Sequence, residues 1–330
     1  MKTSQSIVTI DIGGTKIAGG LVTSDGQIHC LRHIHTEAQQ GGEDVMRRVK
    51  LMVEELVAEG NRIGASLRPV AIGVGTAGEV EPNSGIISFA TSALPGWKGM
   101  HVKERLQTTL GLPTFVDNDA NVMALGETAF GAGRGQRYVL GLTVGTGVGG
   151  GIVIDGRIYH GAHGYAGAMG HIIIDYRSSR QCPCGRFGCM EAYASTPGLV
   201  EEFIQVVGQE YLIERGLNPE GIGIKEIADM AKAGNAEAWQ VIQNGAVYLG
   251  TGIATLLNLF NPDMVVIGGG VANIGATYFE KVRQVASTRS LPTVADTLIL
   301  PARLGAQANL VGAACLAYQE LYRGKPDFWI

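Results

Sequence analysis

The feature that most constrains this chain is an internal repeat, because two segments far apart in the sequence share one pattern. Residues 8–26 and residues 140–156 each contain a β-branched run, a turn rich in glycine and threonine, a second apolar run and an Asp-Gly pair. The pattern predicts strand, turn, strand, turn and strand in both places. Such a duplication predicts two similar lobes, with both glycine turns pointing into the cleft between them.

The rest of the chain predicts an α/β fold with two domains. Hydrophobic spacing predicts helices over 43–59, 196–208, 224–233, 236–259 and 306–321, and buried strands over 70–75, 114–117 and 264–270. A length of 330 residues suits about two domains of roughly 150 residues each. We expect a small lobe over 1–118, completed by a C-terminal helix within 305–330, and a large lobe over 119–304.

Composition and charge exclude several classes of protein. A net charge of −4 and a pI near 6.0 leave no basic stripe for nucleic acid. The N-terminal residues show no signal peptide. The longest uncharged run, Tyr138–Ile154, contains six glycines, so it predicts a buried hairpin rather than a membrane span. We therefore expect a cytoplasmic protein with no membrane or nucleic-acid partner.

The two glycine turns have the chemistry of phosphate-binding loops. Glycines let backbone N–H groups approach phosphate oxygens, a hydroxyl and an ammonium add donors, and a carboxylate holds Mg²⁺ through water. The alternative is a plain hairpin turn, in which glycine pairs are common. A second turn at the equivalent point of the repeat favours phosphate binding. The candidate residues are Asp11, Gly13, Gly14, Thr15, Lys16, Gly145, Thr146 and Gly147.

The second turn also fits Gly-x-Gly-x-x-Gly, the pattern of dinucleotide-binding proteins. The residues after it, 152–158, are β-branched and run into a turn, so the helix N-terminus that a pyrophosphate needs is absent. No Walker A sequence occurs either, which excludes the P-loop NTPases.

The segment Asp117–Asn121 lies where a predicted strand gives way to a helix, a place from which side chains project into clefts. One interpretation makes Asp119 a general base for a substrate hydroxyl and Asn118 an amide that binds hydroxyls. The alternative is that Asp117 or Asn118 caps the helix and Asp119 is solvated.

The loop over 171–189 predicts a metal site. His171, Cys182, Cys184 and Cys189 supply one imidazole and three thiolates, which make a closed tetrahedral zinc shell. A full shell leaves no open position for water, so the zinc would be structural. A redox role or an inert one is the alternative. The other histidines, including His160, have no comparable neighbours in the sequence and are interpreted as surface or core residues.

Together these motifs, with Val266–Gly270, resemble the ROK family of sugar kinases and repressors over residues 6–320. The resemblance implies an actin-like ATPase fold that closes on a sugar and on ATP with Mg²⁺. It implies that Asp119 deprotonates the sugar 6-hydroxyl, and that His171 directs one ring nitrogen to zinc and the other to the sugar. The sugar-binding residues it implies are Gly78, Thr91, Asn118, Asp119, His171 and Glu191, and the glycines it places by the adenosine are Gly268, Gly269 and Gly270.

One departure from the family bears on the substrate. Family glucokinases usually carry Glu-x-Gly-His before the zinc ligand, whereas this chain has Ala168 at the glutamate position. Thr91 is similar to the residue of N-acetylmannosamine kinases at its position. The resemblance therefore favours N-acetylmannosamine or a related hexosamine, with glucokinase as one alternative and a catalytically weak sugar-binding protein as another.

Two further expectations come from the resemblance. Repressors of the family carry a DNA-binding domain ahead of the sugar-binding part, but here the first strand begins within ten residues of the start, so we expect an enzyme. We also expect a homodimer or homotetramer.

Overall fold

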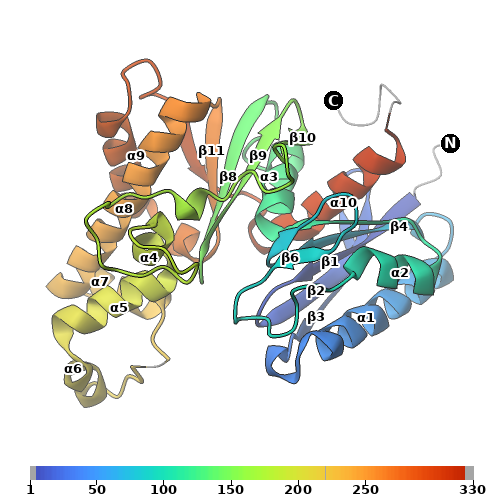
Figure 1. The fold of residues 1–330 in the computed structure, drawn as a ribbon, viewed down its shortest axis with the longest axis horizontal. Coiled ribbons are helices and arrows are strands. Elements are labelled where there is room, and N and C mark those ends of the chain that lie inside the picture. Colours follow the sequence, from blue (N-terminus) through green and yellow to red (C-terminus); the bar gives the residue numbers. More distant parts are fainter. Residues whose placement is uncertain (1–4, 220, 324–330) are drawn as a thin grey trace. The chain divides into compact units, whose positions relative to one another are not determined.

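The computed structural model describes residues 5–219 and 221–323 (Figure 1). The chain forms two compact units. Unit 1 comprises residues 1–137, 151–167 and 303–330, and unit 2 comprises residues 138–150 and 168–302.

Two five-stranded sheets have matching strand orders, which confirms the predicted duplication. The first sheet has the order β3-β2-β1-β4-β7 and the second β10-β9-β8-β11-β12. In the first, β1 is antiparallel to β2 and parallel to β4, and in the second β8 is parallel to β11. The first sheet contains β1 (Gln5–Ile12), β2 (Lys16–Thr23), β3 (Ile28–His35), β4 (Arg68–Thr76) and β7 (Thr114–Asn118). The second contains β8 (Tyr138–Val144), β9 (Val148–Ile154), β10 (Arg157–Ile158), β11 (Met264–Gly268) and β12 (Leu298–Pro301).

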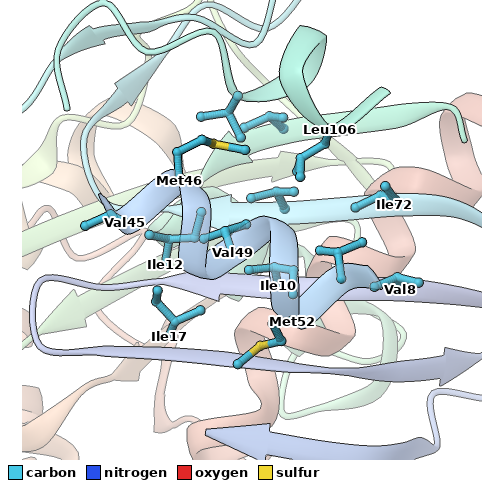
Figure 2. Packing of buried hydrophobic residues seen from close by; sticks show 14 of the residues in the cluster. Val8, Ile10, Ile12, Ile17, Val45, Met46, Val49, Met52, Ile72 and Leu106 are labelled. Atoms are coloured by element: carbon cyan, nitrogen blue, oxygen red, sulfur yellow. The ribbon is translucent and has the colours of Figure 1, made fainter. Parts of the chain in front are cut away.

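Helix α1 (Gly42–Ile63) covers one face of the first sheet, as its apolar spacing predicts. Val45, Val49 and Met52 point from this helix toward strand residues of β1 and β2 (Figure 2). The approach is close, because a Cβ built on Gly19 would lie 2.6 Å from the Met52 sulfur. Helix α2 (Val102–Leu110) contributes Leu106 to the same core.

On the other face of the first sheet, α10 (Ala308–Leu321) packs against α3 (Asp119–Phe130). The two helices approach closely, since a Cβ on Gly312 would lie 1.6 Å from the Val122 carbonyl oxygen. This packing places α3 in unit 1, so the compact unit extends to residue 137 where a boundary near 118 was expected. The expected terminal helix ends at Leu321, and residues 324–330 lie outside the described residues.

Unit 2 is largely helical beyond its strands. Its helices are α4 (Met190–Ala194), α5 (Thr196–Val207), α6 (Gln209–Glu214), α7 (Ile224–Lys232), α8 (Ala236–Phe260) and α9 (Ala276–Arg289). Helix α8 ends where Asn261 adopts a left-handed conformation ahead of Pro262. Of these helices, α4, α6 and α9 are not predicted from the sequence. Among the described residues, no helix combines the length and apolarity that a membrane crossing requires.

Candidate active site and metal cluster

The first glycine turn joins β1 to β2, and Thr36 fixes it with two hydrogen bonds. The buried Thr36 hydroxyl donates to the Gly13 carbonyl oxygen at 2.7 Å, and its backbone N–H donates to the Thr15 carbonyl oxygen at 3.0 Å. Thr15 and Lys16 are exposed. Neither Gly13 nor Gly14 has a positive φ, so here glycine matters for the missing side chain rather than for conformation. The turn therefore offers backbone groups and the Lys16 ammonium to an anion.

Asp11 lies at the end of β1, beside this turn. Its Oδ1 accepts a hydrogen bond from the Asn309 side-chain amide of α10 at 2.9 Å. Burial raises the pKa of Asp11, while the Asn309 hydrogen bond and the Lys16 charge oppose that rise. Asp11 and Lys16 thus stand in one electrostatic environment, as the sequence predicts for a site that holds Mg²⁺ and phosphate.

Asn118 is the N-cap of α3. Its side-chain oxygen accepts from the backbone N–H groups of Ala120 at 2.9 Å and Asn121 at 3.3 Å, and its amide donates to the Gly78 carbonyl oxygen at 2.8 Å. The capping interpretation is therefore confirmed for Asn118. Gly78 has a φ of 100°, and a Cβ there would lie 2.6 Å from the Phe89 carbonyl oxygen, so only glycine fits.

Asp119 is the first residue of α3, and it is half-buried rather than fully solvated. Burial is the main cause that raises the pKa of Asp119 from 3.8 to about 7, and the charge of Asp11 adds to it. A carboxyl with a pKa near 7 exchanges protons readily at neutral pH, which is the property of a general base.

The loop before α2 lies against the first glycine turn. A Cβ on Gly14 would be 3.4 Å from the Ala93 side chain, and the Ala93 backbone N–H donates to the Thr91 hydroxyl at 3.4 Å. Thr91 is exposed. Unit 1 therefore gathers Asp11, the turn, Gly78, Thr91, Asn118 and Asp119 around the ends of β1, β4 and β7.

His160 is a residue of this region that the sequence analysis did not identify. It was interpreted as a surface or core residue, but its Nε2 lies 2.6 Å from Asp117 Oδ2. The two residues are 43 positions apart, so no local pattern could pair them. The one available signal was Asp117 itself, a carboxylate at a buried strand end that needs a donor.

The second glycine turn joins β8 to β9 in unit 2. The Gly145 carbonyl oxygen accepts from the Thr196 N–H at 2.7 Å, and the Val148 N–H donates to Glu191 Oε2 at 2.8 Å. A Cβ on Gly147 would lie 2.6 Å from the same carboxylate oxygen. Thr146 is exposed. The turn is thus fixed at its end by Glu191 and leaves its centre open.

Gly268 is the last residue of β11, and Gly269 and Gly270 follow it and lie beside this turn. Gly269 has a φ of 85°, and a Cβ on it would lie 2.4 Å from the Val144 carbonyl oxygen. The Gly270 backbone N–H lies 3.9 Å from the Cβ position of Gly145. Gly269 and Gly270 are exposed. Unit 2 therefore brings the second turn and the glycines expected at the adenosine together.

The predicted metal ligands cluster in unit 2. The ligand atoms of His171, Cys182, Cys184 and Cys189 all lie within 4.8 Å of one another. Cys184 and Cys189 sulfurs are 3.8 Å apart, and His171 Nδ1 is 3.7 Å from Cys182 Sγ. Tetrahedral zinc, with Zn–S bonds of about 2.3 Å, separates two sulfurs by about 3.8 Å. The donor set and spacing fit a zinc ion.

Glu191 lies between the metal cluster and the second turn. Its Oε2 accepts from the Val148 N–H, and its Oε1 lies 3.3 Å from Cys182 Sγ. Glu191 was expected to bind sugar hydroxyls. In the structure, both carboxylate oxygens also have protein neighbours, so the residue connects the cysteine loop to the glycine turn.

The fold and these two groups of residues define a class of protein. Two sheets with one duplicated strand order, each with a glycine turn between its first two long strands, form the actin-like ATPase fold, as predicted. The sequence model of the ROK family matches residues 7–320. The chain therefore belongs to the ROK family.

Individual relatives agree with this assignment. The glucokinase of Halalkalibacterium halodurans is 36% identical over 317 residues, which cover 95% of each chain. The crystal structure of a ROK family glucokinase from Streptomyces griseus in complex with glucose and AMPPNP has a TM-score of 0.81 and 33% identity, and the match covers 95% of this chain and 99% of that one. A protein from Listeria monocytogenes proposed to be an N-acetylmannosamine kinase has a TM-score of 0.79 and 27% identity, over 96% and 99% of the two chains. These names agree with the predicted class, a phosphotransferase that acts on a sugar hydroxyl.

Proposed function

We propose that this protein is an ATP-dependent sugar kinase that phosphorylates the 6-hydroxyl of a hexose, with glucose as the first candidate acceptor. The observation that carries the proposal is Asp119, a carboxyl at a strand-to-helix junction whose pKa is raised to about 7. The relatives named glucokinase, one of them 36% identical to this chain, support glucose.

In the proposed reaction, Asp119 accepts the proton of the sugar 6-hydroxyl while that oxygen forms a bond to the γ-phosphorus of ATP. The bond between the γ-phosphorus and the bridging oxygen breaks, and ADP leaves with that oxygen. Backbone N–H groups of the glycine turns donate hydrogen bonds to the phosphate oxygens, and the Lys16 ammonium neutralises part of their negative charge. Positioning of the two reactants supplies most of the acceleration, worth roughly 7–11 kcal/mol.

The remaining residues have proposed supporting roles. Asn118, Gly78, Thr91, His171 and Glu191 are proposed to bind and orient the sugar. Gly268, Gly269 and Gly270 contact the adenosine. Asp11 would hold the Mg²⁺ that neutralises the nucleotide phosphates. The imidazole and three thiolates would hold a structural Zn²⁺, which fixes the cysteine loop and the orientation of His171.

A coupled assay for ADP formation tests the proposal across glucose, mannose, N-acetylglucosamine, N-acetylmannosamine, fructose and allose. We expect turnover with at least one sugar, and we expect Asp119→Asn to lower kcat by about 10²- to 10⁴-fold. Asp155→Asn is the matched control, because Asp155 is an exposed residue outside the site. Sugar binding without any turnover would favour the sugar-binding alternative, and near-normal turnover by Asp119→Asn would reject the base.

A second acceptor, N-acetylmannosamine, is favoured by one specific observation. Ala168 is exposed and stands at the start of the short helix that carries His171, where family glucokinases carry a larger acidic side chain. The small side chain leaves room for a 2-acetamido group. Ala168→Glu should then shift the ratio of kcat/KM values toward glucose, and an unchanged ratio would reject Ala168 as the filter.

We also propose that the protein assembles as a homodimer or homotetramer. Unit 2 exposes large apolar side chains, among them Leu259, Leu291 and Leu298 at 69%, 60% and 50%. Size-exclusion chromatography with light scattering measures the mass, and a monomer at working concentration would reject the assembly.

A further inference from the structure

A histidine outside the residues assigned above contacts the strand end that carries Asp119. His160 Nε2 lies 2.6 Å from Asp117 Oδ2. The Asp117 side chain is only 3% exposed and that of His160 is 27% exposed. Asp117 precedes Asp119 by two residues, at the end of β7 just before α3 begins. The contact is therefore adjacent to the proposed base but does not involve it.

Asp117 connects three segments through its two oxygens. Its Oδ1 accepts from the Asn118 backbone N–H and from the Asn121 side-chain amide, both at 2.8 Å. Its Oδ2 faces His160. The carboxylate therefore ties together the end of β7, the first turn of α3 and the segment after β10. Because the carboxylate accepts, Nε2 of His160 is the nitrogen that carries the hydrogen.

The segment that carries His160 is itself well fixed within unit 1. The Tyr159 N–H donates to the Ile152 carbonyl oxygen at 2.8 Å, and the Ala166 N–H donates to the His160 carbonyl oxygen at 3.0 Å. A Cβ on Gly164 would lie 2.6 Å from the Pro82 ring. Because the backbone on both sides of His160 is held, its imidazole can act as a fixed point for Asp117.

The charges around His160 favour a strong hydrogen bond. Burial disfavours the charged imidazolium, but the hydrogen bond and negative charge of Asp117 on β7, with the charge of Glu320 on α10, outweigh burial and raise the pKa of His160. Hydrogen bonds in which a partner is ionised are about twice as strong as neutral ones. The contact thus suits a role in orientation.

We propose that His160 is a positioning residue, whose Nε2–H holds Asp117 so that the β7–α3 junction presents Asp119 to the sugar hydroxyl. The inference rests on the proposed function. His160 acts through Asp117 and does not touch the reacting atoms. Without its donor, the buried Oδ2 loses the hydrogen bond and the junction can shift. A misplacement of about 1 Å lowers a rate by about 100-fold.

Two substitutions separate the hydrogen bond from simple packing. His160→Gln keeps a side-chain N–H at a similar reach, whereas His160→Leu keeps bulk and removes the donor. We expect His160→Leu to lower kcat by about 10-fold or more with the KM for ATP changed less than about twofold, and His160→Gln to recover most of the loss. His163→Leu, at an exposed histidine of the same segment, is the matched control and should behave as wild type.

Failure of this inference is distinguishable from failure of the proposed function. An active wild type with an unchanged His160→Leu, or with His160→Leu better than His160→Gln, would overturn the inference alone. A wild type that phosphorylates no sugar would overturn the proposed function and the positioning role with it. NMR titration of His160 without substrate reports on the contact independently. We expect Asp117→Asn to lower the His160 pKa, and an unaffected titration would overturn the contact.

Discussion

Replacing the proposed base should lower kcat by about 10²- to 10⁴-fold and should stabilise the protein increasingly as the pH rises from 5 to 8. The pKa of Asp119 in the folded chain is about 7, against an ordinary value of 3.8. Because the folded value lies above the unfolded one, the contribution of this carboxyl to stability is complete below about pH 4 and is lost as the pH rises through about 7. Asp119→Asn removes the ionisable group and with it this loss.

The size of the effect follows from the two pKa values. Each pKa unit of separation corresponds to about 1.4 kcal/mol. At about pH 5 the Asp119 carboxyl is ionised only in the unfolded protein, which lowers the stability of the wild type by about 1.6 kcal/mol relative to its value at low pH. At about pH 8 the full separation of the two pKa values lowers it by about 4 kcal/mol. The stability of Asp119→Asn relative to wild type should therefore increase by about 2.5 kcal/mol between pH 5 and pH 8.

Urea denaturation at the two pH values measures the difference. Trp97 is fully buried in unit 1, the unit that contains Asp119, so its fluorescence reports the relevant transition in a background with Trp239 and Trp329 replaced by phenylalanine. Asp155→Asn is the control. Arg137 lowers the pKa of Asp155, so the Asp155 carboxyl is ionised in both the folded and the unfolded protein between pH 5 and pH 8. A stability difference between Asp119→Asn and wild type that is the same at both pH values would refute the raised pKa.

Three further predictions concern other parts of the molecule. Glu127 is fully buried and accepts hydrogen bonds from the backbone N–H groups of Ala132, Arg303 and Leu304. Glu127→Gln should therefore lower the free energy of unfolding by about 1–3 kcal/mol, and an unchanged urea midpoint would contradict this. At Gly145 there is space for an added methyl group, because the nearest atom is 3.9 Å away, so Gly145→Ala should not lower stability. If phosphate approaches this turn, the substitution should raise the KM for ATP, and an unchanged KM would exclude that approach. Purified protein should contain about one zinc per chain, and chelation should lower its melting temperature. Cys184→Ser should lose the metal, whereas the control Cys30→Ser should keep it. Metal retained by Cys184→Ser would reject the ligand set.

Local periodicity explains which parts of the fold could be predicted from the sequence. The glycine turns, the long amphipathic helix α1 and the strand-to-helix junction at Asn118 each depend on residues close in sequence. Helix α9 was missed because its apolar residues do not form one clear stripe, although Tyr278 and Val282 are buried. No linker or change in composition marks the expected boundary near 118, whereas the compact unit is set by close contact of α3 with α10, nearly 200 residues later.

In the candidate site, too, the residues that depend on local sequence could be predicted and those that depend on distant parts of the chain could not. The second group contains the residues that act on the proposed base. Asp119 and Asn118 could be predicted because a strand end followed by a helix start is a local signal. The raised pKa of Asp119 could not, because Asp11 comes from another strand and burial comes from the packed unit. His160 reaches Asp117 across 43 positions for the same reason. The sequence identifies the group proposed as the base. The residues that raise its pKa and contact its strand end are brought to it by the parallel pairing of β1, β4 and β7 and by the segment after β10. Substitutions at His160 should therefore change the rate of phosphotransfer with the base itself intact.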